Sequence, residues 1–200
     1  MRYFFALLIL LVGGALSPLR SQLLDSLELA LAPEYTDLRA ALENPSAVIR
    51  LSLRKQKLKT FPKEILELKN LQYLDLSKNA LLELPDSLVQ LKNLQYLNVS
   101  RNGLLALPKN IGQFANLVHL NLNQNEIQVI PYSFGDLIKL QYADLWSNNL
   151  DYFPESLAKL KNLRWMDLRN ILIPAQNQEN IQSMLPECKI YFSPPCNCSW

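Results

Sequence analysis

Few side chains in this sequence could carry out acid–base catalysis. His119 is the only histidine among the 200 residues, so any acid–base scheme would have to run through it. Ser77 and Ser100 are candidate nucleophiles, but they lie on other predicted strands than His119. Each is four residues further along its strand than His119 is along its own. At about 3.3 Å per residue that separation is roughly 13 Å, which excludes a Ser–His pair. We therefore predict no catalytic residue and no enzyme.

Two carboxylates, Asp144 and Asp167, could form a second kind of site. They lie 23 residues apart, at equivalent places on neighbouring predicted strands, where paired carboxylates favour either a bound cation or one raised pKa. Arg169 lies two places after Asp167 on the same strand and would neutralise that carboxylate without a bound cation. The sequence also lacks a glycine-rich phosphate loop and a zinc-ligand spacing. We therefore predict no metal ion and no cofactor.

The three cysteines, Cys188, Cys196 and Cys198, all fall near the C-terminus. An oxidising compartment would favour a disulfide between Cys188 and one of the other two, which leaves one thiol over. The alternative is that all of these thiols are unpaired. A zinc site is disfavoured because a Cys-x-Cys pair with one remote cysteine and no nearby histidine lacks the usual four-ligand spacing.

The N-terminus has the pattern of a secretory signal peptide over residues 1–15. Arg2 supplies a positive start, residues 3–12 are apolar, and residues 13–15 are the small residues of a cleavage site. The alternative is an uncleaved anchor, but a span needs about 20 apolar residues, and the run here ends before Arg20. We predict a secreted, periplasmic or cell-surface protein with no stable membrane span after cleavage; a cytoplasmic protein is the alternative.

The strongest signal in the sequence is a repeat of 23 residues. Apolar residues recur at places one, four, six and eleven of the repeat, with asparagine at place nine in the middle copies. Five copies have an apolar–proline pair in their second half. Such self-similarity is typical of a solenoid, in which each unit buries its apolar face against the next. We predict six repeats over residues 48–175, which start at Val48, Leu71, Leu94, Leu117, Leu140 and Leu163.

The repeat predicts the shape of each coil. Alternating apolar and polar residues around places three to seven indicate a short strand with one buried face, and stacked copies form a parallel sheet. Proline prevents continuous helix or ladder hydrogen bonding, so the return path on the convex side should be irregular, with little α-helix. The asparagines fall where each strand turns away, and their amides should hydrogen-bond the backbone of neighbouring coils. This column consists of Asn79, Asn102, Asn125 and Asn148.

The segments that flank the repeats should cap the two ends of the core. Residues 16–47 are predicted to form a helical N-terminal cap, with apolar residues at helical spacing over 23–31 and again over 35–43. Residues 176–200 are predicted to form a C-terminal cap, with a helix, a short strand over 189–192 and the cysteine-containing tail.

These repeats resemble the typical leucine-rich repeat. The resemblance rests on the runs over residues 70–79 and 84–88, and it is strongest to the Leu-Pro-type repeats of small secreted bacterial proteins and of the cytosolic Ras-scaffold group. It implies an α/β repeat solenoid: a horseshoe with a concave parallel sheet, an irregular convex side, a helical N-terminal cap and a helix–strand C-terminal cap. It also implies protein binding without naming the ligand. The absence of a cysteine-rich N-terminal cap favours an exported bacterial protein.

The repeat also identifies the residues that should face outward on the concave sheet. Place three supplies mostly aromatic side chains, and because neighbouring strands lie about 4.8 Å apart, the rings should form a stacked or offset ladder. Tyrosine and tryptophan dominate binding hot spots, although tyrosine at this place also serves ladder packing. The predicted binding residues are Tyr73, Tyr96, His119, Tyr142, Asp144, Trp146, Trp165, Asp167 and Arg169. Among these, Tyr142, Trp146 and Trp165 in the C-terminal half are the strongest candidates.

The balance of charge helps to define the partner. Lys and Arg total 20 and Asp and Glu total 18, so the chain is nearly neutral and lacks the basic surface that binds nucleic acid. Basic residues gather on the first strands, whereas Asp144 and Asp167 lie on the last, which gives a polarised concave face. We predict a monomeric, exported module that binds a protein, or less readily a glycan, on that face. The alternative function is a cytosolic scaffold in small-GTPase signalling.

Overall fold

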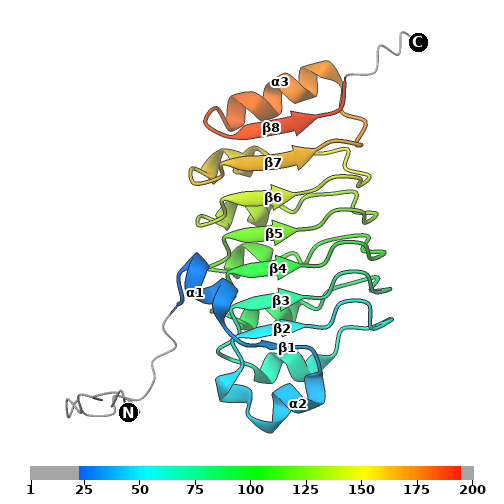
Figure 1. Ribbon diagram of the computed structural model, residues 1–200. Helices are drawn as coiled ribbons and strands as arrows, with labels where there is room; N and C mark the ends of the chain where they lie inside the picture. Colours follow the sequence, from blue (N-terminus) through cyan, green and yellow to red (C-terminus); the bar gives the residue numbers. More distant parts are fainter. Residues whose placement is uncertain (1–22, 195–200) are drawn as a thin grey trace, which may run out of the picture.

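The computed structural model describes residues 23–194; the predicted signal peptide over 1–15 and two of the predicted disulfide cysteines, Cys196 and Cys198, lie outside these residues. Within them, the chain forms one sheet of eight parallel strands in sequential order (Figure 1). The strands are β1 (Glu34–Tyr35), β2 (Arg50–Ser52), β3 (Tyr73–Asp75), β4 (Tyr96–Asn98), β5 (His119–Asn121), β6 (Tyr142–Asp144), β7 (Trp165–Leu168) and β8 (Lys189–Phe192).

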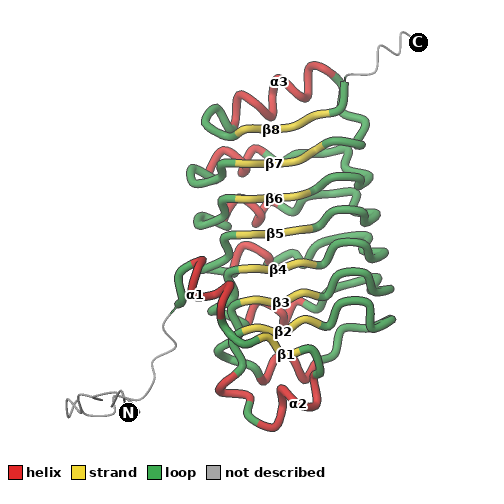
Figure 2. Tube along the Cα trace, in the orientation of Figure 1, coloured by secondary structure: helices red, strands yellow, loops and turns green. Residues whose placement is uncertain are grey.

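Each repeat strand pairs with the equivalent residues of the next repeat. Tyr73 pairs with Tyr96, Tyr96 with His119, and His119 with Tyr142. Every place of the repeat therefore forms a straight column across the sheet, and the strands stack in one row in Figure 2, with loops at both ends. The predicted α/β repeat solenoid with a parallel sheet is confirmed.

Short 3₁₀ helices recur along the convex side. Proline directly precedes four of them, because its fixed φ suits the start of a tight turn and its missing donor costs nothing there. The six are η1 (Pro45–Ala47), η2 (Lys63–Glu67), η3 (Asp86–Gln90), η4 (Ile111–Gln113), η5 (Tyr132–Asp136) and η6 (Glu155–Lys159). Successive turns pack so closely that a Cβ at Gly135 would lie 2.1 Å from the carbonyl oxygen of Ser156. The predicted irregular convex path is confirmed as a series of 3₁₀ turns.

The core is a single stack of leucine side chains between the sheet and the convex turns. Leu71, Leu74 and Leu76, at places one, four and six, are fully buried, and so are the equivalent residues of the neighbouring repeats. Burying side chains of this size stabilises the fold by about 1.5–3 kcal/mol each. The continuous core makes each coil depend on its neighbours, and so fixes the spacing of the columns on the concave face.

Helices and a final strand cover the two ends of this core. At the N-terminal end, α2 (Leu38–Glu43) packs through its buried Ala41. At the C-terminal end, α3 (Ala175–Met184) buries Ile181 and leads into β8, which extends the sheet beyond β7. Between residues 23 and 194 no helix is long and apolar enough to cross a membrane.

The first helix, α1 (Ser26–Leu31), does not lie at the end of the stack. Figure 1 shows it in front of the sheet, beside β3 to β5. Two leucines of the predicted apolar stripe, Leu27 and Leu31, are 67% and 76% exposed, whereas Leu29 is the residue that the helix buries. The difference arises because β1 follows α1 and pairs with β2, so the end of the core is left to α2.

Candidate binding surface on the concave face

The aromatic residues at place three form the predicted ladder over four strands. The rings of Tyr73 and Tyr96 stack at 4.4 Å between centroids, and those of His119 and Tyr142 stack at 4.5 Å. Between the two pairs, Tyr96 and His119 are 5.8 Å apart and tilted by 36°. Stacking follows from the strand register, which sets equivalent side chains side by side. The guanidinium of Arg50 covers the outer end of this ladder, 4.6 Å from the Tyr73 ring.

The ladder is interrupted before the last repeat. Trp165 pairs in register with Tyr142 along the sheet, but its ring contacts Tyr191 of β8 instead, at 5.9 Å and 53°. No ring contact joins Tyr142 to Trp165 within the described part of the chain. A hollow of about 400 Å³ lies there, bordered by both rings and by His119 and Asp144.

Helix α1 is attached to the concave face by polar contacts that sequence reasoning missed. The Arg50 guanidinium donates to the carbonyl oxygens of Leu29 and Ala30. The backbone of Leu24 accepts from the Gln95 amide and donates to the Gln72 amide, both at 2.9 Å. In the sequence, the only trace of these contacts is glutamine at place two of these repeats. Gln72 is fully buried, and a buried amide needs partners, but the sequence pattern does not identify the segment around α1 as that partner.

These contacts create a second concavity beside the ladder. A cleft of about 670 Å³ lies between α1 and the rings, with Leu29 and Ala30 on one side and the stacked rings of Tyr73 to Tyr142 on the other. The N-terminal part of the concave face is thus a flanked cleft. Among the described residues, no helix lies in front of β6 and β7 in Figure 1; α3 lies at the end of the sheet, next to β8.

The polar residues at place five have a structural role in addition to their place on the concave face. In five successive repeats the side-chain oxygen at place five accepts the backbone N–H two residues later, at place seven, which closes the turn that ends each strand. The five residues are Asp75, Asn98, Asn121, Asp144 and Asp167. Both aspartate and asparagine occur in this role, so the turn needs the acceptor and not the charge.

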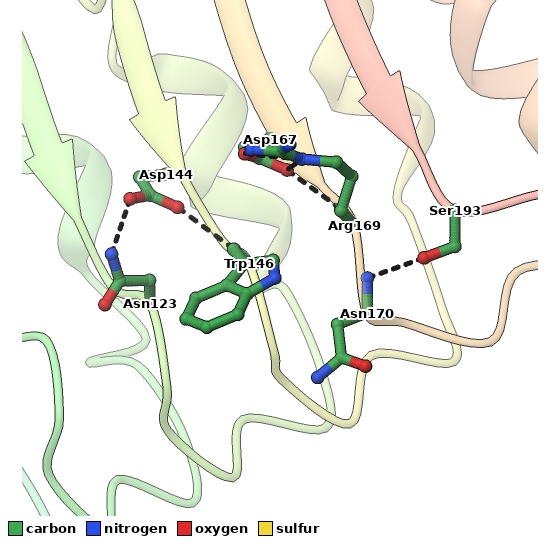
Figure 3. A network of polar contacts seen from close by, with 7 residues as sticks. All are labelled: Asn123, Asp144, Trp146, Asp167, Arg169, Asn170 and Ser193. Atoms are coloured by element: carbon green, nitrogen blue, oxygen red, sulfur yellow. Dashed lines mark hydrogen bonds and ion pairs between the residues drawn. The ribbon is translucent and has the colours of Figure 1, made fainter.

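The two carboxylates considered as a pair, Asp144 and Asp167, have different protein partners. Figure 3 shows Asp144 accepting from the amide of Asn123 at 2.6 Å and from the backbone of Trp146, whereas Asp167 forms an ion pair with Arg169. Burial raises the pKa of Asp144, while the hydrogen bond from Asn123 opposes that shift. The hydrogen bond to Asp167 raises the pKa of Arg169. No cluster of metal-ligating side chains occurs among residues 23–194.

Trp146 lies at place seven, where the neighbouring repeats have Asn123 and Arg169. Its side chain is partly buried, and Figure 3 shows the indole in the space between Asn123 and Asn170. Its backbone carbonyl accepts from Gln124 at 2.8 Å. Trp146 therefore adds a broad apolar ring just beyond β6, but it is not among the residues that line the hollow.

The titratable rings of the ladder are shifted toward their neutral forms. Burial raises the pKa of Tyr73 to about 12 and also raises the pKa of Tyr96. Burial lowers the pKa of His119, so the imidazole is uncharged at neutral pH. A neutral aromatic surface of this kind suits binding through ring faces.

The residues at place eight all adopt left-handed backbone conformations. Their φ angles lie between 52° and 59°, although none is glycine. Such residues cost about 1–2 kcal/mol each, and the cost is offset because the N–H in this conformation reaches the next coil, as from Lys78 to Ser100 at 2.9 Å. Basic side chains cluster at the first strands. The pKa of Lys78 is lowered there, mainly by the charge of Arg101, then by burial, and then by the charges of Arg54 and Lys55.

The asparagine column joins adjacent coils. The amide of Asn125 donates to the carbonyl oxygens of Val99 and Leu122, and its oxygen accepts from Leu104. Asn79, Asn102 and Asn148 make the same three contacts with the equivalent residues of their own and the preceding coils. Each side chain thus ties its own coil to the preceding one.

Cys188 is the one predicted disulfide residue inside the described part of the chain. Its side chain is buried next to the C-terminal cap, and burial raises the pKa of its thiol to about 11. It has no disulfide partner among residues 23–194. The predicted bond to Cys196 or Cys198 stays a prediction.

Comparison with known protein families agrees with the fold. Residues 47–121 match the family described as leucine-rich repeat region, and residues 115–171 match the family described as leucine rich repeat. The chain is therefore a leucine-rich-repeat protein. Proteins of this family are generally non-enzymatic, and their repeats commonly mediate protein binding. A search of curated proteins found no significant match.

Three solved structures illustrate the similarity. A leucine-rich-repeat protein of Leptospira interrogans is 34% identical over 82% of this chain, with a TM-score of 0.67. The ectodomain of the plant membrane receptor kinase GASSHO1/SCHENGEN3 from Arabidopsis thaliana, in complex with CASPARIAN STRIP INTEGRITY FACTOR 2, is 28% identical over 76%, with a TM-score of 0.63. An internalin from Listeria monocytogenes is 26% identical over 64%, with a TM-score of 0.55.

This chain is shorter than each of these proteins. It covers 48% of the Leptospira protein, 19% of the plant ectodomain and 54% of the internalin. What the chain shares with them is the repeat and its concave sheet.

Proposed function

We propose that this protein is an exported, non-enzymatic module that binds a protein partner on the C-terminal half of its concave face. The observation that supports this most directly is the interruption of the ladder between Tyr142 and Trp165, where both rings border a hollow of about 400 Å³. Exposed aromatic surface next to a hollow is typical of binding hot spots. The plant ectodomain, which was solved with a bound partner, is a precedent for binding by this fold.

Replacement of Tyr142, Trp146 and Trp165 together by Ala tests the proposed surface. The partner is first isolated from the exported fraction of the native source, and its affinity for the wild type and the variant is then measured by calorimetry. Since hot-spot residues contribute about 2 kcal/mol or more each, we expect affinity to fall by at least about 100-fold. Circular dichroism would check that the fold is retained.

The matched control removes three large side chains that are exposed outside the concave face: Tyr132, Tyr152 and Leu172, each replaced by Ala. We expect this control to bind as the wild type does. Unchanged affinity in the concave variant, or an equal loss in the control, would overturn the proposed surface.

The proposed export rests on the signal-peptide pattern over residues 1–15. Intact-mass measurement of the protein from its source should give a chain cleaved near Ala15. The same measurement under reducing and non-reducing conditions reports the predicted disulfide of Cys188, and a native mass reports the predicted monomer. An intact Met1 on a cytoplasmic protein would instead support the signalling-scaffold alternative.

A further inference from the structure

The chain places an arginine beside an aromatic ring and a carboxylate at both ends of its concave face. At the first strands, the guanidinium of Arg50 lies 4.6 Å from the Tyr73 ring and pairs with Glu34 at 2.8 Å. At the last strands, the guanidinium of Arg169 lies 5.5 Å from the Tyr191 ring and pairs with Asp167. In both, the guanidinium contacts a ring and donates to an acid, which are the two interactions that suit its flat, charged shape.

The hollow between these two arrangements has the same two components without the arginine. Tyr142 and Trp165 supply ring faces, and Asp144 supplies a carboxylate at the border of the hollow. Asp144 has no ion-pair partner among residues 23–194, because the nearby Arg169 pairs with Asp167. The charge of Arg169 acts on Asp144 only at a distance, and burial still raises the pKa of Asp144. A cation in direct contact would therefore stabilise the ionised carboxylate further.

The hydrogen bonds that Asp144 already makes leave room for such a cation. Its two oxygens each accept one protein donor, from Asn123 and from the backbone of Trp146. A carboxylate has about four acceptor positions, so two remain for a bidentate guanidinium. The volume of about 400 Å³ also exceeds that of one such group.

We infer that this hollow, bordered by Tyr142, Asp144 and Trp165, receives an arginine side chain of the bound partner. The inference rests on the proposed function, since it names the group that the concave face recognises. Arginine is favoured over lysine because its guanidinium is more weakly hydrated and stacks on ring faces. Lysines also lie over rings in this chain: Lys159 over Tyr132 on the exposed convex side, and Lys189 at 4.9 Å from the Tyr191 ring. The preference for arginine therefore rests on the chemistry of the guanidinium, which the lysine probe below tests.

A titration of the purified full chain with small probes tests the inference. The probe is N-acetyl-L-arginine methylamide, followed by nuclear magnetic resonance at the indole N–H of Trp165 and the backbone N–H of Trp146. The neutral isostere N-acetyl-L-citrulline methylamide and the lysine analogue serve as comparison probes. We expect saturable shifts with the arginine probe, and at least roughly tenfold weaker binding of the other two, as loss of a charge-assisted hydrogen bond implies.

Asp144→Asn is the decisive variant, and Asp75→Asn is its matched control. Asn98 and Asn121 make the same turn contact from the same place, so both variants keep the acceptor that the fold needs. We expect Asp144→Asn to weaken the arginine probe about tenfold and Asp75→Asn to leave it unchanged. The inference is overturned by equal binding of citrulline, by tighter binding of lysine, or by equal binding to the wild type and Asp144→Asn.

The outcome can be separated from that of the proposed function. If Asp144→Asn binds the isolated partner as tightly as the wild type, while the Tyr142, Trp146 and Trp165 triple variant does not bind it, the arginine inference fails and the binding surface stands. If the triple variant also retains full affinity, the proposed function fails as well. Loss of partner affinity in both variants supports both proposals.

Discussion

The concave face has two parts, one up to Tyr142 and one beyond it. Their side chains occupy the same places of the repeat but pack differently. From Arg50 to Tyr142 the side chains at place three form an unbroken series of contacts, with two stacked pairs joined by a tilted one, and α1 is attached beside it. Beyond Tyr142 the stack is broken, and Trp165 turns to Tyr191 of the terminal strand. Identical strand register therefore does not ensure identical surfaces. Neighbours from outside the repeats decide whether a ring packs within the ladder or borders open space.

Charge differs between the two parts in the same way. The first strands display Arg54, Lys55, Lys78 and Arg101 at their ends, close enough to one another to lower the pKa of Lys78. The last strands present Asp144, whose pKa burial raises, and an internally paired Asp167. A partner with a basic contact group would thus be directed to the C-terminal part.

The largest expected effect comes from loosening the stack of coils beneath the first part. Asn125 is buried and bonds to three backbone groups on two coils. Asn125→Ala leaves those groups without partners, so we expect the free energy of unfolding to fall by about 3 kcal/mol. Urea denaturation measures the change, and Asn162→Ala, which removes one exposed contact to Ile138, should change it by less than about 0.5 kcal/mol. Equal losses would mean that the column does not join the coils.

A second test compares the two arginines that stand beside rings. Arg50→Ala removes three contacts to the α1–β1 segment from a side chain that is only 16% exposed, so we expect α1 to lose about 2 kcal/mol of local stability. Hydrogen exchange of the amides of residues 26–31 should accelerate accordingly. Arg169→Ala removes an ion pair with the buried Asp167 at the other end of the sheet, so it should not accelerate exchange of residues 26–31. If exchange in α1 stays unchanged in Arg50→Ala, the helix is held by other contacts.

The sequence was sufficient to predict what depends on the repeat itself. The period of 23 fixed the register, so the asparagine column and the row of rings could be placed without coordinates. Contacts from outside the repeats could not be found this way. Leu24 bonds to Gln72 and Gln95, which lie 48 and 71 residues away along the chain, and no local pattern encodes that docking.

Two features within the repeats also escaped sequence reasoning. The left-handed turn at place eight has lysine, arginine, glutamine, serine or asparagine instead of glycine, because the bond to the next coil enforces the conformation. Asp144 and Asp167 were assigned to binding alone, yet each also closes the turn of its own strand. Asn98 and Asn121 at the same place are the residues that could have revealed this role.

The smallest expected effect concerns His119, which lies between Tyr96 and Tyr142 where the first part of the ladder approaches the second. Burial lowers its pKa from the ordinary value of 6.5, so the folded chain binds a proton less readily than the unfolded chain. The stability that depends on the neutral ring is therefore complete above about pH 6.5 and is lost as the pH falls through the lowered pKa. His119→Phe keeps a ring in the ladder but removes this titration.

We therefore expect the free energy of unfolding to fall less between pH 7 and pH 5 in His119→Phe than in the wild type. His119 is the only histidine of the chain, so few other groups titrate in this range. The raised pKa of Asp144 acts in the opposite direction, since protonation of that carboxyl on acidification relieves its burial. Urea denaturation at the two pH values measures the difference. If the free energy of unfolding falls equally in wild type and variant, the imidazole is as easily protonated within the ladder as in the unfolded chain. The first part of the ladder would then be as open to water as the second.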